Sequence, residues 1–143
     1  MQSQYGSDMR KVACEGLSRG AAISYEVTWE DRRHGTNYFA LTISHSGGIP
    51  LELPPPFIQR LLAGEYGTAP FAGAHFFMYC GMQDEEWGAE MCRQMRHAKN
   101  LMQQYGAVIE GFIEDANGKH RGYHLNAQHH EAGVQTFIRL TSD

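Results

Sequence analysis

The sequence predicts a single α+β domain over residues 1–143, in which one antiparallel sheet of five or six strands carries a long amphipathic helix and one or two short helices on one face. Three observations lead to this prediction. Several segments alternate apolar and polar residues, as half-buried strands do. Residues 84–105 repeat apolar side chains at helical spacing. Asn117-Gly118 lies between two apolar runs, which is typical of a β-hairpin turn.

The first third of the chain is expected to form a short helix and then a hairpin. Ser7 can cap a helix whose apolar residues continue to Leu17. Period-two alternation over residues 22–29 and again over residues 38–45 predicts two strands. The polar segment between them, residues 30–37, predicts the tip of a hairpin.

The middle of the chain is expected to be mainly helical. Pro56 can serve as the first residue of a short helix that ends before Gly64. Residues 75–80 fit either a strand or a buried connector, and periodicity does not decide between them. A long helix is predicted from Asp84 to Tyr105. Its apolar stripe consists of Trp87, Met91, Met95, Ala98, Met102 and Tyr105.

The last third of the chain predicts three strands, at residues 107–114, 119–125 and 134–140. The first two would be joined by the Asn117-Gly118 turn, because asparagine and glycine tolerate positive φ. The resulting order of helices and strands is similar to that of PAS-like and profilin-like sensor folds, in element order alone.

Composition indicates which partners and which cellular compartment to expect. The net charge of −4, with only three lysines, argues against a nucleic-acid partner, because neutralising phosphates needs clustered basic residues. The three cysteines, Cys14, Cys80 and Cys92, are widely spaced and odd in number, so we expect no disulfide framework and a reducing compartment. No signal-peptide core and no membrane span are recognised, so the expected location is cytoplasmic.

Histidines suggest a metal site by their number but not by their arrangement. His120 and His124 are four residues apart, which on a helix would bring them to one ion. In the strand predicted here they would lie roughly 13 Å apart, too far for one ion. His129-His130-Glu131 is interpreted as a solvated loop. We therefore predict neither a metal nor a cofactor.

No catalytic residue is assigned. The chain has no Gly-x-x-x-x-Gly-Lys loop and no Gly-x-Gly-x-x-Gly fingerprint, and no serine-hydrolase elbow is identified. Scattered cysteines such as Cys80 are more often small buried apolar residues than nucleophiles.

Two candidate binding sites remain. If the first and last strands are antiparallel neighbours, the tip residues Arg32, Arg33 and His34 would meet the loop residues His129 and His130. That basic cluster would accept a small anionic ligand or an acidic protein surface. A pocket between the helices and the sheet would be lined by Trp29, Phe39, Met95 and Tyr105.

Three hypotheses of function follow. The first is a non-enzymatic binding module of the accessory, immunity or inhibitor type, which acts through protein contacts or self-association. The second is a sensor or carrier of a small ligand with an anion-accepting pocket. The third is an enzyme that uses histidine or cysteine, and this one requires converging side chains with shifted pKa values.

Overall fold

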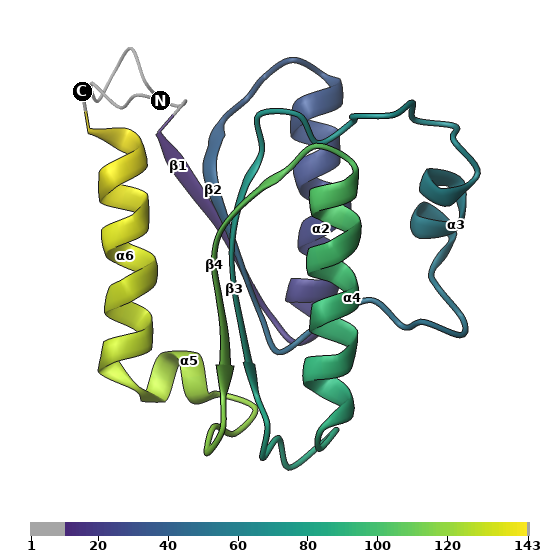
Figure 1. Ribbon diagram of the computed structural model, residues 1–143. Helices are drawn as coiled ribbons and strands as arrows, with labels where there is room; N and C mark the ends of the chain where they lie inside the picture. The colour runs from purple at the N-terminus through teal and green to yellow at the C-terminus, as the bar shows by residue number, and fades with distance from the viewer. Residues whose placement is uncertain (1–10, 143) are drawn as a thin grey trace.

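The computed structural model describes residues 11–142, and in this part of the chain a parallel sheet lies between two layers of helices (Figure 1). The elements, in chain order, are β1 (Val12–Leu17), α2 (Arg19–Arg33), β2 (Phe39–His45), α3 (Pro56–Leu62), β3 (His75–Gly81), α4 (Glu90–Gln104), β4 (Val108–Asp115), α5 (Gly122–Leu125) and α6 (Ala127–Thr141). The described strands form one sheet in the order β1-β2-β3-β4.

All three strand pairs of this sheet are parallel, so the prediction of one antiparallel sheet of five or six strands is wrong. Val12 pairs with Phe39, Thr42 with Phe76, and His75 with Val108. A parallel sheet covered on both faces buries whole strands rather than alternate residues. The inner strands show this, because β2 is continuously buried from Leu41 to His45.

Helices cover both faces of the sheet (Figure 1), and each face has its own apolar core. On one face, α2 and α4 cover the strands, and Phe57, Ile58 and Leu61 of α3 join the same core. On the other face, α5 and α6 lie over a smaller core that includes Phe77 and Tyr123.

The segment predicted as the first hairpin strand is the helix α2. Its buried residues, Ala21, Ser24, Tyr25 and Thr28, recur at three- and four-residue steps, whereas Ile23 is 58% exposed. Apolar residues do alternate with polar ones in this segment, at Ile23, Tyr25, Val27 and Trp29. This alternation does not match the set of residues that the structure buries. Helical packing of small and hydroxyl-bearing residues overrides the β-propensity of this segment.

Three further elements differ from prediction. Residues 12–17, expected to end a helix, form β1, while Ser7 and Met9 lie outside the described residues. Residues 122–125, within the predicted strand 119–125, form the one-turn helix α5. The predicted strand 134–140 lies in α6, which the Asn126 side chain caps by accepting a hydrogen bond from Gln128 N.

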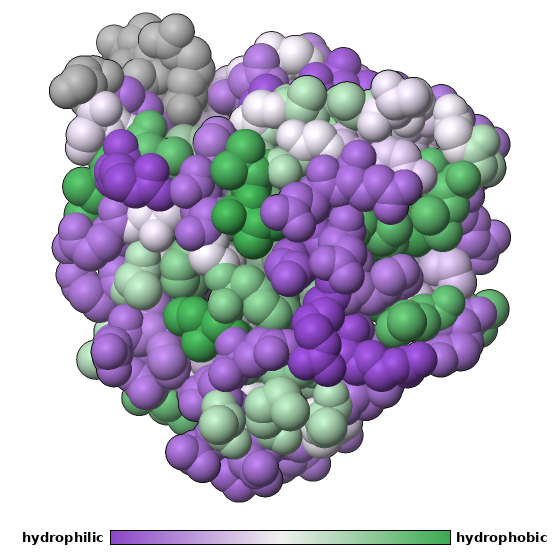
Figure 2. Space-filling model, in the orientation of Figure 1, coloured by the Kyte–Doolittle hydropathy of each residue, from purple (hydrophilic) through white to green (hydrophobic). Residues whose placement is uncertain are grey.

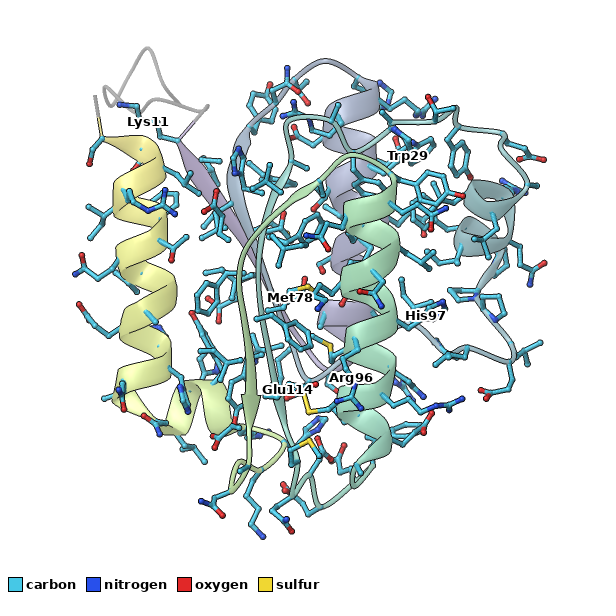
Figure 3. The ribbon with its side chains drawn as sticks, in the orientation of Figure 1. Lys11, Trp29, Met78, Arg96, His97 and Glu114 are labelled. Atoms are coloured by element: carbon cyan, nitrogen blue, oxygen red, sulfur yellow. A yellow bond between two sulfur atoms is a disulfide. The ribbon has the colours of Figure 1, made fainter. Side chains whose placement is uncertain are left out.

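Four elements are confirmed in type. The alternating segment that becomes β2, the proline-led α3, the long α4 and the strand β4 all appear in the structure. Residues 75–80, left open above, belong to β3. The helix α4 begins at Glu90 rather than Asp84, because residues 85–89 form turns. Its Arg96 forms an ion pair with Glu114 of β4 (Figure 3).

A disulfide joins Cys80 of β3 to Cys92 of α4, with Cα atoms 5.3 Å apart. This corrects the expectation that the cysteines are unpaired. Residue spacing alone could not reveal the bond, because β3 and α4 become neighbours only in the folded sheet. The disulfide closes the segment that contains Asp84.

Apolar side chains also reach the surface near α3. Leu53 is 80% exposed and Leu62 is 49% exposed, and Figure 2 shows apolar surface over α3 and the segment before it, at the right of the view. No helix among residues 11–142 is long and apolar enough to cross a bilayer.

Candidate active site

Ser18 alone turns the chain from β1 into α2. Its backbone has φ 60° and ψ −116°, and its N–H donates to His45 O at 3.0 Å. Positive φ is uncommon for residues other than glycine, and such strained positions cluster at functional sites. A serine held in this turn presents its hydroxyl at the carboxyl edge of the sheet.

Two glycines permit this tight turn. A Cβ atom on Gly16 would collide with the Gly20 backbone, and a Cβ atom on Gly47 would collide with the Ser18 carbonyl oxygen. Small residues at both positions let the end of β1, the start of α2 and the end of β2 approach closely. The strained Ser18 conformation is therefore fixed by its neighbours.

Asp84 and His120 form a buried pair at the same edge of the sheet. Asp84 follows β3 and His120 follows β4, and His120 Nδ1 donates to Asp84 Oδ2 at 2.7 Å. The Asp84 side chain has no exposed surface. Its Oδ1 accepts the backbone N–H groups of Glu86 and Trp87, each at 2.9 Å. These bonds fix the carboxylate, and the carboxylate fixes the imidazole.

The end of β2 connects this pair to Ser18. His45 O accepts the Ser18 N–H, and the next residue, Ser46, donates its hydroxyl to His120 O at 2.5 Å. Two consecutive residues thus hold Ser18 on one side and His120 on the other. In parallel strands the carboxyl ends share one edge, which explains how residues so far apart in sequence come together.

His120 Nε2 lies 3.3 Å from Glu86 Oε2, and no hydrogen bond joins it to Ser18 Oγ in the described chain. The Glu86 side chain is 58% exposed, so it can rotate into water. An imidazole whose Nδ1 is held by a buried carboxylate can take up a proton at Nε2. The three side chains therefore supply a hydroxyl, a base and a group that orients the base.

A groove begins at Ser18. A pocket of about 180 Å³ is lined by Ser18, Ser46 and Trp87 among others. It shares Ala22, Gly48 and Pro50 with a neighbouring pocket of about 330 Å³. The second pocket is mainly apolar, with the lining residues Ala22, Ile23, Glu26, Gly48, Ile49, Pro50, Leu53, Pro55, Phe57 and Ile58.

The basic residues singled out from the sequence do not form one cluster. Arg32, Arg33 and His34 lie at the end of α2, beside the start of β2, whereas His129 and His130 lie in α6. His129 Nε2 is 3.1 Å from Asp115, the last residue of β4. Because the strands are parallel, these groups lie at opposite ends of the sheet. The premise of adjacent first and last strands is wrong, because the segments expected to form them, residues 22–29 and 134–140, lie in the helices α2 and α6.

The residues predicted to line one pocket lie in different surroundings. Met95 has no exposed surface and lies in the core. Trp29 and Tyr105 are partly buried and pack against that core. Trp29 does line a pocket of about 520 Å³, together with Arg32 and Arg33. Figure 3 shows Trp29 at the upper end of α2, away from the edge that carries Ser18. Ligand binding by any of these residues stays a prediction.

The sequence does contain a local signal for the turn at Ser18. Gly16-Leu17-Ser18-Arg19-Gly20 fits the Gly-x-Ser-x-Gly pattern of a strand-to-helix elbow, which the sequence analysis overlooked because it assigned the residues up to Leu17 to a helix. Asp84 and His120 carry no such pattern. His120 and His124, set aside as a strand pair, lie outside the strands and contact different carboxylates, Asp84 and Glu15.

Comparison with known proteins establishes the fold. No protein-family model matches the chain, and no curated protein matches it by sequence. Solved structures do match. A Bacillus cereus carboxylesterase aligns with a TM-score of 0.63 at 16% identity, over 97% of this chain and 54% of its own. An esterase from Rhizomucor miehei aligns with a TM-score of 0.65 at 13% identity, over 97% and 53%.

A bifunctional acetyl ester-xyloside hydrolase from Caldicellulosiruptor lactoaceticus aligns with a TM-score of 0.58 at 13% identity, over 96% of this chain and 58% of its own. The chain thus has an α/β-hydrolase-like fold and spans about half the length of these proteins. These neighbours overturn the hypothesis of a non-enzymatic binding module, including its inhibitor and immunity variants.

Proposed function

We propose that this chain carries the catalytic triad of a serine hydrolase that cleaves carboxylic esters. Ser18 is the nucleophile, His120 the general base and Asp84 the residue that orients the base. The observation that supports this most is the placement of the three residues after β1, β3 and β4, with the buried 2.7 Å Asp84–His120 contact. The chain order serine, aspartate, histidine is that of α/β-hydrolases.

The reaction follows from these positions. Ser18 Oγ attacks the ester carbonyl carbon while its proton moves to His120 Nε2, and the carbonyl oxygen becomes an oxyanion. The intermediate collapses, and the leaving alcohol takes the proton from Nε2, which leaves an acyl group on Ser18. Water then attacks the acyl carbon as His120 removes its proton, and the acid and free Ser18 are released. Rotation of Glu86 away from Nε2 precedes the first step.

The amide of Arg19 supports the charged intermediate. It is the first N–H of α2 and has no acceptor within the helix. The positive end of the helix dipole and this N–H both favour an oxyanion beside Ser18. The residue after the nucleophile supplies such a donor in α/β-hydrolases.

The groove beside Ser18 indicates which esters fit. Its mainly apolar part begins at Ala22, one turn after Ser18. An ester with an apolar acyl or alkyl group would place that group there, and each buried CH₂ contributes about 0.8 kcal/mol. We therefore propose esters with aliphatic groups as substrates.

The test is the Ser18→Ala variant, assayed with p-nitrophenyl esters of increasing acyl length. Loss of the nucleophile is expected to lower kcat by about 10⁴-fold or more. A fluorophosphonate should label the unsubstituted chain at Ser18, as identified by mass spectrometry. The matched control is Ser142→Ala, at an exposed serine after α6, which should keep full activity. Full activity in Ser18→Ala would refute the proposal.

Two earlier predictions stay open beside this proposal. A cytoplasmic location is still a prediction, and the Cys80–Cys92 disulfide weighs against it because disulfides persist in oxidising compartments. Self-association or a protein partner also stays a prediction, for which the exposed Leu53 and Leu62 offer a surface.

A further inference from the structure

A second group of polar side chains meets beside the candidate triad. Glu15 comes from β1, His45 from the end of β2, and His124 from α5. Glu15 Oε1 lies 3.1 Å from His45 Nε2 and 2.5 Å from His124 Nε2. One ligand atom from each residue lies within 4.8 Å of the other two. The three side chains therefore converge on one point.

The surroundings of the group fit a small ligand that enters from one side. The His45 side chain has no exposed surface, whereas His124 is 46% and Glu15 37% exposed. His45 Nδ1 has no hydrogen-bond partner, so all polar contacts of this buried ring lie on its Nε2 side. The buried imidazole thus offers Nε2 toward the two exposed partners.

Two imidazoles and one carboxylate are the donor set of many divalent transition-metal sites. Zinc binds histidine nitrogen at about 2.0–2.1 Å and carboxylate oxygen at about 2.0–2.2 Å. A set of three such ligands leaves a fourth position for water, which the exposed sides of His124 and Glu15 can admit. In the metal-free chain, Glu15 Oε1 is the atom that contacts both imidazoles, so a bound ion would take the place of these shared hydrogen bonds.

We propose that Glu15, His45 and His124 bind one divalent transition-metal ion, with Zn²⁺ as the best match to their donor atoms. This reverses the sequence-based expectation that the chain has no metal site. The proposal does not depend on the proposed esterase activity, because none of the three residues belongs to the triad.

The position of the site gives the ion a structural role. Glu15 stands three residues before Ser18, His45 directly precedes Ser46, and His124 follows His120 by four residues. One ion would therefore cross-link the three segments that hold the nucleophile and the base. Such an ion stabilises the folded state because it binds the assembled ligands more tightly than the unfolded chain.

The test is titration of the tag-free, oxidised chain with Co²⁺ and Zn²⁺. The intact Cys80–Cys92 disulfide keeps those two sulfurs from competing as thiolates. We expect one Co²⁺ per chain with visible d–d absorption, displacement by Zn²⁺, and a Tm that rises with metal concentration. Esterase activity is not needed for this readout, so failure here and failure of the proposed function are distinguishable.

Two variants and one control complete the test. His124→Ala and Glu15→Gln should each weaken binding by at least tenfold and remove the Tm shift, while their metal-free melting stays cooperative. His34→Ala, at an exposed histidine at the far end of α2, should bind as the unsubstituted chain does. Absence of saturable binding, or binding that His124→Ala leaves unchanged, would overturn the proposal.

Discussion

Replacing Asp84 by asparagine tests the roles assigned to the triad with the smallest change in shape. Asp84 Oδ1 accepts two backbone N–H groups, from Glu86 and Trp87, and Oδ2 accepts the His120 Nδ1–H. In the variant, the amide oxygen should keep the two backbone bonds, which directs the NH₂ group at His120 Nδ1. The imidazole must then carry its proton on Nε2, where it can no longer accept one from Ser18.

The expected loss is large in rate and small in stability. A wrong imidazole tautomer in a serine hydrolase lowers kcat by about 10⁴-fold, which corresponds to about 5 kcal/mol of barrier. KM should change little, because the Asp84 side chain has no exposed surface from which to touch substrate. The assay is steady-state hydrolysis of a p-nitrophenyl ester, with urea denaturation of each variant as the stability measurement.

Asp31→Asn is the matched control. Asp31 is also a buried carboxylate that holds a turn, since it accepts hydrogen bonds from Thr36 Oγ1 and from the backbone N–H groups of Tyr38 and Phe39. It lies near the end of α2 remote from Ser18. Its variant should lose stability but keep kcat. The assignment of Asp84 is refuted if Asp84→Asn keeps more than a tenth of kcat, or if both variants lose activity equally.

Three further predictions concern stability. Met95→Ala should lower the free energy of unfolding by about 2–5 kcal/mol in urea titrations, because Met95 has no exposed surface; a loss under half a kcal/mol would contradict its place in the core. Joint replacement of Cys80 and Cys92 by alanine should cost about 3 kcal/mol in the same assay, and equal stability would show that the bond contributes nothing. Burial alone would raise the pKa of Glu110, but hydrogen bonds from Arg139 and His75 outweigh it and hold that pKa below its ordinary value. Stability from this depressed pKa is present above the ordinary glutamate value of about 4.3 and is lost as pH falls through the folded pKa. Arg139→Gln should therefore flatten the acid side of a pH–stability curve, and an unchanged slope would refute the link.

The elements that could be predicted are those whose local signal agrees with their packing. The α4 stripe at Met91, Met95 and Met102 is buried, so periodicity found the helix. Pro56 marked the start of α3 for a steric reason that holds in any fold. In α2 the signals conflict, because Ser24 and Thr28 are buried through hydroxyl pairs with Ser44 and Thr42. The periodicity of apolar residues cannot identify buried polar residues that pair in this way.

The parallel arrangement could not be reached from local signals. The Asn117-Gly118 turn exists, with Gly118 N bonded to Asp115 O, but the chain leaves it into α5 rather than into a second strand. A turn motif predicts that the chain changes direction, but it does not predict whether a strand or a helix follows. Strand pairing across whole helices has no comparable mark in the sequence.

The residues of the candidate site also differ in whether a local signal marks them. The elbow around Ser18 is a local motif and was available from the sequence. Asp84 and His120 are ordinary residues until the strand order places the end of β3 beside β2 and the end of β4 beside β3. Their spacing along the chain depends on loop lengths, so only the folded sheet identifies them.

The parallel sheet also governs how the chain acquires its structure. Val12 pairs with Phe39 and His75 with Val108, each across a complete helix, so no ladder can form from a tight turn. Closing such long loops costs chain entropy before any ladder bond forms, and sheets of this kind fold slowly. During synthesis β1 emerges before β2, and the pairing of these two strands must wait until β2 has left the ribosome. Recovery of folded protein from cells should therefore depend on chaperone supply and growth temperature more than its final stability alone would imply.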